Sequence, residues 1–232
     1  MDTNRYISDN LRGSDIFKSL TSKQYAELLN SGHSLKLQPK TILFHQGDSA
    51  KRCFRVNRGR LKLTKLNEQG REVIFRYIGT GELTAAVAVL KNRDYLVTAE
   101  ATEETDVTGW DKPTMLQWLR RYPDITISLM GIILDRIDDI QHRYLEICTE
   151  HVNQRIARSL LRLMRRAGSK TPDGILIGIP LSRQNIADYS GTTLYTVSRT
   201  LSAWEKKGWI KSGREQITIT NPHALVQFAE TG

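Results

Sequence analysis

Cysteine is scarce in this chain of 232 residues, and its scarcity excludes several kinds of protein. Only Cys53 and Cys148 are present, far apart in the sequence, so neither a disulfide framework nor a cluster of cysteine ligands is expected. No run of about 18 apolar residues occurs, which argues against a membrane-spanning helix. Residues 1–5 lack the charged-then-apolar pattern of a secretory signal. We therefore expect a cytoplasmic protein with free thiols and no membrane partner.

Sequence patterns that carry enzymatic chemistry are missing too. The chain shows no Gly-x-Ser-x-Gly motif, no phosphate-binding loop and no paired acidic motif. A cupin-like metalloenzyme would need clustered histidine and glutamate ligands, and the β-rich part of the chain offers only His45. The sequence therefore predicts no catalytic residues, no metal site and no enzymatic activity.

Positive charge, in contrast, is present in excess and is unevenly distributed. The formal net charge is +9. Residues 151–232 hold twelve Lys and Arg against five Asp and Glu, whereas residues 1–150 hold 22 against 20. A basic patch gains free energy by counterion release when it binds a polyanion such as DNA. We expect double-stranded DNA as the partner of the last third, since no long amphipathic Lys-rich helix points to a membrane surface.

The most informative motif lies in this basic third. Residues 180–201 predict a short helix, a tight turn and a second helix, the arrangement that presents side chains to the DNA major groove. Ser182 is a good N-cap, and Gly191 can adopt the positive φ that ends the first helix. Either Thr192 or Thr193 would cap the second helix. Its apolar positions recur at spacings of four and three, at Val197, Leu201 and Trp204.

The opposite face of the second helix is predicted to point outward. All of its side chains can form hydrogen bonds: Tyr195, Ser198, Arg199 and Ser202. Residues 210–219 follow as two strand-like pieces around a turn at Ser212-Gly213, so the motif is predicted to be a winged helix. The alternative is an ordinary helical hairpin with a solvated basic face.

The first half of the chain predicts many short strands. Turn glycines recur at separations of 12, 11 and 11, at Gly47, Gly59, Gly70 and Gly81, a spacing typical of antiparallel β-rolls and barrels. Apolar residues alternate with polar ones and are expected to form one core face: Ile42, Phe44, Phe54, Val56, Leu61, Leu63, Val73, Phe75 and Tyr77. A β-roll that holds or senses something is the resulting expectation.

After Pro123 the apolar pattern changes to a helical period. The spacings 3, 4, 3, 4, 3, 4 predict a seam packed against a partner helix: Met130, Ile133, Ile137, Ile140, Tyr144, Ile147 and His151. A two-fold dimer is the favoured outcome, because helix-turn-helix proteins pair to match palindromic half-sites. The alternative is a helix packed on its own β-roll through Leu129, Ile132 and Leu134, and both arrangements can hold at once.

These three parts, in this order, resemble the CRP/FNR family of bacterial transcription regulators. The resemblance is carried by residues 44–48, 56–62 and 152–157 and, most specifically, by 181–199. The expected fold class is α+β. It comprises an antiparallel β-roll of the jelly-roll, cyclic-nucleotide-binding-like type (1–122), a dimerisation helix (123–151) and a winged helix-turn-helix (152–232). The resemblance implies a homodimer that binds a palindromic promoter site and contacts RNA polymerase.

The sequence departs from the family at the effector ligands. Ala86 and Leu96 stand where cyclic-AMP-responsive members carry the ribose glutamate and the phosphate arginine, and Ile140-Gln141 replace the Thr-Ser pair that reads adenine. A phosphate buried without its cation is costly, so cyclic AMP is not expected. Nor is a [4Fe–4S] cluster, because two cysteines cannot supply four thiolates. No cofactor is predicted, although the sequence leaves haem open, with conceivable axial ligands in His33, His45, Cys53, Met130, His142 and His151.

The resemblance also implies roles in DNA binding. Four residues would read bases: Leu194, Tyr195, Ser198 and Arg199. We expect Arg199 to bind guanine O6 and N7. Five residues would contact the DNA backbone, the first three near helix N-termini and the last two on the wing: Arg183, Gln184, Thr193, Lys211 and Arg214. A nucleoid protein that coats DNA without sequence preference is the alternative, and it would need no symmetric dimer seam.

Overall fold

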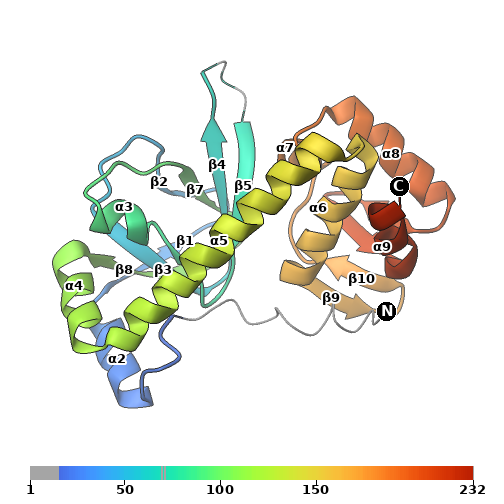
Figure 1. Cartoon of the computed structure of the whole chain (residues 1–232). Helices are drawn as coiled ribbons and strands as arrows, with labels where there is room; N and C mark the ends of the chain where they lie inside the picture. The colour runs from blue at the N-terminus through green and yellow to red at the C-terminus, as the bar shows by residue number, and fades with distance from the viewer. Residues whose placement is uncertain (1–15, 69, 71, 232) are drawn as a thin grey trace. The chain divides into compact units, whose positions relative to one another are not determined.

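The computed structural model of the chain describes residues 16–68, 70 and 72–231. These residues form two compact units that divide between Ile140 and Gln141 (Figure 1). The first unit combines two β-sheets with helices, and the second is mainly helical with one small sheet. The predicted α+β class is confirmed. Within the described residues, no helix combines the length and the apolar character needed to cross a membrane.

Two four-stranded antiparallel sheets form the β-roll of the first unit, with strand orders β1-β8-β3-β6 and β2-β7-β4-β5. The strands are β1 (His33–Leu37), β2 (Ile42–Phe44), β3 (Arg52–Arg58), β4 (Leu61–Leu66), β5 (Glu72–Ile78), β6 (Leu83–Thr84), β7 (Thr98–Ala101) and β8 (Thr105–Asp111). The predicted turn glycines Gly47, Gly59, Gly70 and Gly81 all have positive φ angles. The evenly spaced glycines therefore marked real chain reversals.

One apolar cluster fills the interior of the roll. It draws side chains from strands of both sheets, including Val56, Leu61 and Val107, each with none of its surface exposed. Phe44 and Tyr95 stack there with ring centroids 4.0 Å apart. The Tyr95 hydroxyl donates to the Arg52 carbonyl at 2.7 Å and accepts from the Arg52 amide at 3.2 Å, so this buried ring has a polar anchor.

Helices cover the outer face of the β1-β8-β3-β6 sheet. They are α2 (Ser22–Asn30), α3 (Ala86–Leu90), α4 (Lys112–Arg121) and the first turns of α5 (Pro123–Thr149). A second buried cluster lies beneath them, containing Cys53, Met115, Ile125, Leu129 and Ile132. Leu129 and Ile132 therefore pack within their own unit, as predicted by the alternative in which this helix packs on its own β-roll. Leu134, the third residue of that alternative, is 59% exposed instead.

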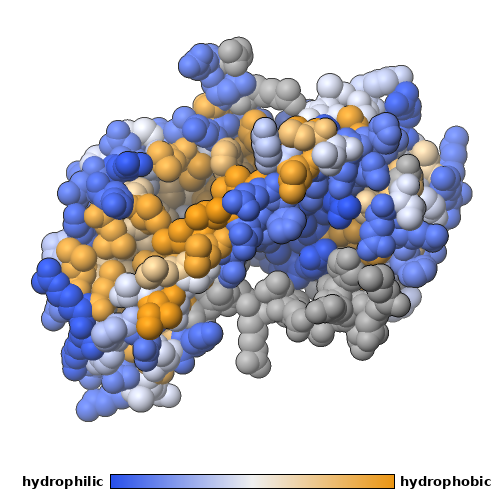
Figure 2. Space-filling model, in the orientation of Figure 1, coloured by the Kyte–Doolittle hydropathy of each residue, from blue (hydrophilic) through white to orange (hydrophobic). Residues whose placement is uncertain are grey.

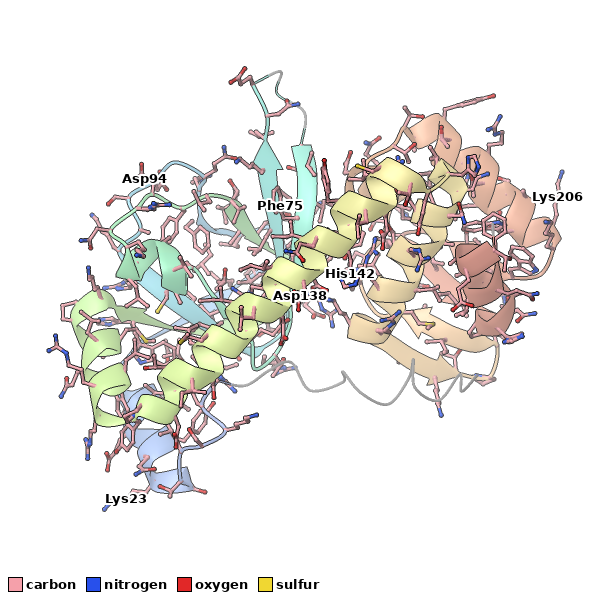
Figure 3. All side chains as sticks on the ribbon, viewed as in Figure 1. Lys23, Phe75, Asp94, Asp138, His142 and Lys206 are labelled. Carbon is pink, nitrogen blue, oxygen red and sulfur yellow. The ribbon has the colours of Figure 1, made fainter. Side chains whose placement is uncertain are left out.

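Two residues predicted on the core face of the roll are exposed instead. Ile42 is 40% exposed and Phe75, labelled in Figure 3, is 46% exposed. In both strands the pairing register shifts at a β-bulge: the pairing skips Phe75 between Ile74 and Arg76, and Ile42 and Phe44 pair with consecutive residues of β7. Because a bulge inserts one residue, it moves the neighbouring side chains to the other face, so the strict alternation failed.

Gly59 is a turn position where an added methyl group has no room. A Cβ atom there would lie 2.4 Å from the Glu104 carbonyl oxygen, at a φ of +85°. Gly47 has a similar φ of +89°, but a Cβ atom would meet nothing within 4 Å. Gly47→Ala is expected to cost about 1 kcal/mol of unfolding free energy, from backbone strain alone.

Gly59→Ala should cost at least about 3 kcal/mol, because the backbone clash adds to the same strain. Urea titration of the two variants side by side measures the difference. Equal losses would show that the loop around Glu104 moves aside without penalty.

The second unit combines the end of α5 with a small sheet and four more helices. Its elements are α6 (Val152–Ala167), β9 (Gly168–Thr171), β10 (Gly174–Ile177), α7 (Arg183–Ser190), α8 (Leu194–Lys206), β11 (Ile210–Gly213), β12 (Gln216–Ile219) and α9 (Pro222–Thr231), with strand order β11-β12-β10-β9. The β11–β12 hairpin turns at Arg214-Glu215, with Glu215 at a φ of +54°, and not at the predicted Ser212-Gly213. Ser212 and Gly213 are instead paired strand residues, opposite Ile217 and Gln216, so the hairpin is two pairs longer than predicted.

The compact units do not coincide with the three predicted segments. They divide inside α5, which is one continuous helix of 27 residues. The last turns of α5 therefore belong with the second unit. The boundaries at residues 122 and 151 stay predictions about functional parts, and residues 1–15 of the first segment lie outside the described residues.

Candidate nucleic-acid interface

Side-chain caps build the helix-turn-helix, as its sequence predicts. The Ser182 hydroxyl accepts from the Asn185 amide at 3.0 Å, and the Asn185 side chain accepts from the Ser182 amide at 3.0 Å. Gly191 ends α7 at a φ of +66°. Of the two candidate caps for α8, Thr193 is used: its hydroxyl accepts from the Thr196 amide at 3.2 Å. These contacts fix where α8 begins and hence which residues lie in its first turns.

The two faces of α8 differ sharply. Val197 and Leu201 are fully buried and Trp204 is 3% exposed, so this face anchors the helix. On the other face Tyr195 is 75% exposed and Leu194 is 46% exposed. Arg199 is exposed and Ser198 is partly exposed. All four predicted base-reading residues therefore lie on the accessible side of one rigid helix, and Lys206 points outward at its end (Figure 3).

The predicted backbone-contacting residues near the helix starts already have partners within the domain. The Arg183 guanidinium lies 3.8 Å from the Glu205 carboxylate. The Gln184 side-chain amide donates to the Asp188 carboxylate at 2.8 Å. The Thr193 hydroxyl is engaged as the cap of α8. Arg183 is 40% exposed and its ion pair is long, so the guanidinium is available to a phosphate at little cost.

The wing carries the two remaining predicted contacts. Lys211 forms an ion pair with Asp173 of the β9–β10 turn at 3.1 Å, and both side chains are more than 60% exposed. A pair this exposed contributes little to stability, so Lys211 can exchange its partner for a phosphate. Arg214 is exposed at the tip of the hairpin turn.

Several residues that support this surface escaped the sequence analysis. Asn153 at the start of α6 accepts from the Thr200 hydroxyl of α8 at 2.9 Å. Glu205 accepts from the Ser212 amide at 3.0 Å and so connects α8 to the wing. Neither residue has a local sequence signal, because each contact joins separate elements. The β9–β10 hairpin does have such a signal, since Pro172-Asp173-Gly174 is a strong turn sequence.

The exposed apolar face of α5 is the candidate dimer surface. Five of the six predicted dimerisation residues are exposed, from 44% to 67%: Met130, Ile137, Ile140, Tyr144 and Ile147. Ile133 differs, because it packs against the cluster beneath α2–α5 of its own unit. Figure 2 shows apolar side chains along the first half of α5.

The exposures identify a second stripe on α5 beside the predicted seam. Its members recur at spacings 3, 4, 3, 4, 3, 4 and are all exposed: Ile127, Met130, Leu134, Ile137, Gln141, Tyr144 and Cys148. This stripe avoids Ile133 and lies opposite the buried Ile125, Leu129 and Ile132. It shares Met130, Ile137 and Tyr144 with the predicted seam, so those three positions face a partner in either arrangement.

The residues around α3 do not fit a cyclic nucleotide. Ala86 is 5% exposed and belongs to the cluster beneath the helices, whereas Leu96 is 62% exposed. Neither side chain can bind a ribose hydroxyl or a phosphate. Ala85, at a φ of +64°, begins α3 with no side-chain cap, and Phe44 and Tyr95 fill the nearby interior of the roll. Residues 85–90, which contain α3, carry no polar side chain.

The two cysteines have opposite environments. Burial raises the pKa of the Cys53 thiol to about 12, so it is protonated at neutral pH and is a poor metal ligand. Cys148 is exposed on α5. The other conceivable haem ligands, His33, His45, Met130, His142 and His151, are exposed. Within the described part of the chain, no group of three or more His, Cys, Asp or Glu side chains is placed to hold a metal ion.

Comparison with known families matches both units. Residues 34–122 match the model of the cyclic nucleotide-binding domain, and residues 154–228 match that of the Crp-like helix-turn-helix domain. The two models together cover the β-roll with α4 and most of the second unit.

Individual relatives align along most of their length. The chain is 28% identical to the global nitrogen regulator of Synechocystis over 81% of this chain and 84% of that protein. It is 26% identical to the fumarate and nitrate reduction regulatory protein of Escherichia coli, over 83% and 77% of the two chains. Among solved structures, a CooA mutant from Carboxydothermus hydrogenoformans shares the fold, with a TM-score of 0.76, 20% identity and coverage of 95% and 98%.

Proposed function

This chain belongs to the CRP/FNR family of transcription regulators, and from that premise we propose that its homodimer binds a palindromic promoter site with one α8 in the major groove of each half-site. The observation that carries the proposal is the capped α8, buried through Val197 and Leu201 and exposed through Tyr195 and Arg199. A helix anchored in this way can present the same side chains to each half-site. The family is one of regulators and not of enzymes.

We assign base reading to Leu194, Tyr195, Ser198 and Arg199. Arg199 is the only one of these four residues with a charged donor. Its guanidinium can donate two parallel hydrogen bonds, to O6 and N7 of one guanine. Tyr195 can donate or accept a single hydrogen bond, and Leu194 offers only apolar contact, as to a thymine methyl group. Phosphate contacts fall to Arg183, Gln184 and Thr193 at the helix starts and to Lys211 and Arg214 on the wing.

Selection from a randomised duplex library followed by footprinting tests this proposal. The selected sites should be palindromes with half-site centres about 10 base pairs, or a multiple of that, apart. Footprinting should show discrete protected regions. Uniform protection of unrelated DNA would contradict sequence-specific regulation and favour a nucleoid protein that coats DNA.

We further propose that the DNA-bound dimer contacts RNA polymerase, as a regulator that activates transcription does. We also propose that it acts in the bacterial cytoplasm, where chromosomal DNA lies. Transcription in vitro from a promoter with the selected palindrome provides the test. An increase in transcript that requires the intact palindrome supports contact with the polymerase, whereas unchanged or lowered transcript contradicts it.

Cyclic AMP is proposed not to regulate this protein. Calorimetric titration at micromolar protein concentration should show no binding, because Ala86 and Leu96 provide neither a carboxylate for the ribose nor a cation for the phosphate. The positive control is a cyclic-AMP-responsive member of the family, which should bind when titrated under the same conditions. Micromolar binding by the unchanged protein, with a gain in DNA affinity, would contradict the proposal.

A further inference from the structure

Resting on the proposed function, we propose that charged contacts between the end of α5 and the DNA-binding unit set the half-site spacing that the dimer accepts. The contacts join the last turns of α5, and Glu150 directly after them, to α6 and α7, all within the second unit. We call them the corner clamps, formed by the pairs Glu146–Arg162, Glu150–Arg158 and Arg143–Tyr189. His142, labelled in Figure 3, marks this part of α5.

Glu146 and Arg162 form the tightest clamp. Arg162 Nη1 donates to both carboxylate oxygens of Glu146, at 2.6 and 2.8 Å. The side chains are 13% and 21% exposed, so solvent screens the pair only weakly. Arg162 Nη2 also donates to the buried Ser159 hydroxyl at 3.3 Å, which holds the guanidinium in one orientation on α6. One turn of α5 is thereby tied to the middle of α6.

Two further clamps act on either side of this one. Arg158 Nε lies 2.7 Å from Glu150 Oε1, as an ion pair whose angle is not that of an aligned hydrogen bond. The Arg143 guanidinium lies over the Tyr189 ring, 4.5 Å from its centroid, and donates to the Tyr189 hydroxyl. Tyr189 is 6% exposed near the end of α7. The end of α5 is thus held at three points by two different helices.

The chain between α5 and α6 would not hold this geometry alone. Only Glu150 and His151 separate Thr149, the last residue of α5, from Val152, the first of α6. Two connecting residues have four soft backbone dihedrals and permit many crossing angles. Charge-assisted contacts among largely buried side chains select one angle, since other angles leave buried charges unpaired.

The consequence for DNA binding follows from symmetry. If the two copies of α5 pair about a two-fold axis, the angle between α5 and α8 determines the separation of the two α8 helices. Adding one base pair between the half-sites increases their separation by about 3.4 Å and rotates one relative to the other by about 34°. A junction between α5 and α6 that is held at one angle cannot follow this change. The dimer should therefore favour one spacing.

The test compares palindromes whose central spacer is changed by one or two base pairs in either direction. The wild-type dimer should bind its preferred spacer on the order of tenfold more tightly than a spacer one base pair different. The double variant Glu146→Gln with Glu150→Gln should reduce this preference to about threefold or less. Its affinity for an isolated half-site should stay unchanged, because no clamp residue lies on the exposed face of α8.

Two matched variants separate clamping from folding. Glu146→Arg with Arg162→Glu exchanges the charges of the tightest clamp and should restore the preference for one spacing. Glu103→Gln removes a 3.9 Å ion pair with Arg60 in the β-roll and should leave the preference unchanged. If the double variant Glu146→Gln with Glu150→Gln fails to fold, Arg143→Gln takes its place. This substitution removes the contact with Tyr189 and leaves both ion pairs intact.

The outcomes distinguish this inference from the proposed function. If the wild-type protein shows no preference for palindromes, the proposed function is wrong. If the wild-type dimer prefers one spacing and a folded clamp variant keeps that preference in full, the clamps do not set spacing. A folded charge-exchange variant that accepts every spacer would also overturn the inference.

Discussion

Replacing Ile137 with aspartate is expected to leave the protein monomeric and to lower its affinity for a palindromic site by at least about a hundredfold. Ile137 is 44% exposed in the protomer and lies on both candidate stripes of α5. Because the interface is two-fold symmetric, each substitution occurs in it twice. Dimerisation would therefore remove two carboxylates from water and bury them in an apolar interface. Each costs several kcal/mol unless it is paired. Sedimentation equilibrium gives the mass, and titration of the palindrome gives the affinity.

Two single variants identify which stripe is used. Leu134→Asp changes only the stripe defined by exposure, whereas Ile140→Asp changes only the seam predicted from the sequence. We expect Leu134→Asp to dissociate the dimer more strongly, because the predicted seam includes Ile133, which already packs within its own unit. If Ile137→Asp sedimented as a dimer, dimerisation through α5 would be wrong altogether.

Removal of the Arg199 side chain should weaken DNA binding by roughly 1–3 kcal/mol per half-site and abolish the preference at one base pair. The reason is that a bidentate contact to guanine is lost and no neighbouring group replaces it, since Ser198 and Tyr195 carry no second cationic donor. Both half-sites are affected, so the effect on the dimer is doubled. Binding of Arg199→Ala to a randomised site library measures it.

Arg183→Ala serves as the matched control, because it removes the same charge at the start of α7. It should weaken all sequences about equally and lower the salt dependence by about one ion per subunit. Loss of the 3.8 Å contact with Glu205 should matter little, since the pair is partly solvated. If Arg199→Ala kept its full base preference but lost salt dependence, the two roles would have to be exchanged.

The helix-turn-helix could be predicted because its signals are local. Ser182, Gly191 and Thr193 each act within four residues of their own position, so their types alone locate the ends of α7 and α8. The long α5 was predictable for a related reason, since its apolar period extends over many turns. The family resemblance then added what local patterns do not provide, namely the expectation of a homodimer on a palindromic promoter site.

Other features depend on contacts that sequence spacing does not reveal. The bulge at Phe75 depends on how β4 pairs with β5, and no alternation pattern within β5 shows it. Ile133 belongs to the predicted heptad, but the cluster beneath the helices decides which side of α5 is already covered. The pairing of Glu146 with Arg162 joins residues 16 positions apart on different helices, so no local pattern indicates it.

The contrast between the two cysteines gives the protein a chemical probe of its own pairing. A thiol with a pKa of about 12 is almost entirely protonated at pH 8, so maleimides should leave Cys53 unmodified while the fold is intact. Cys148 is exposed in the protomer and lies on the α5 stripe that we expect to face the partner. Maleimide should therefore modify Cys148 quickly in a monomeric variant and slowly in the dimer. The rate of labelling at this one thiol thus measures how much of the protein is paired, without any added cysteine.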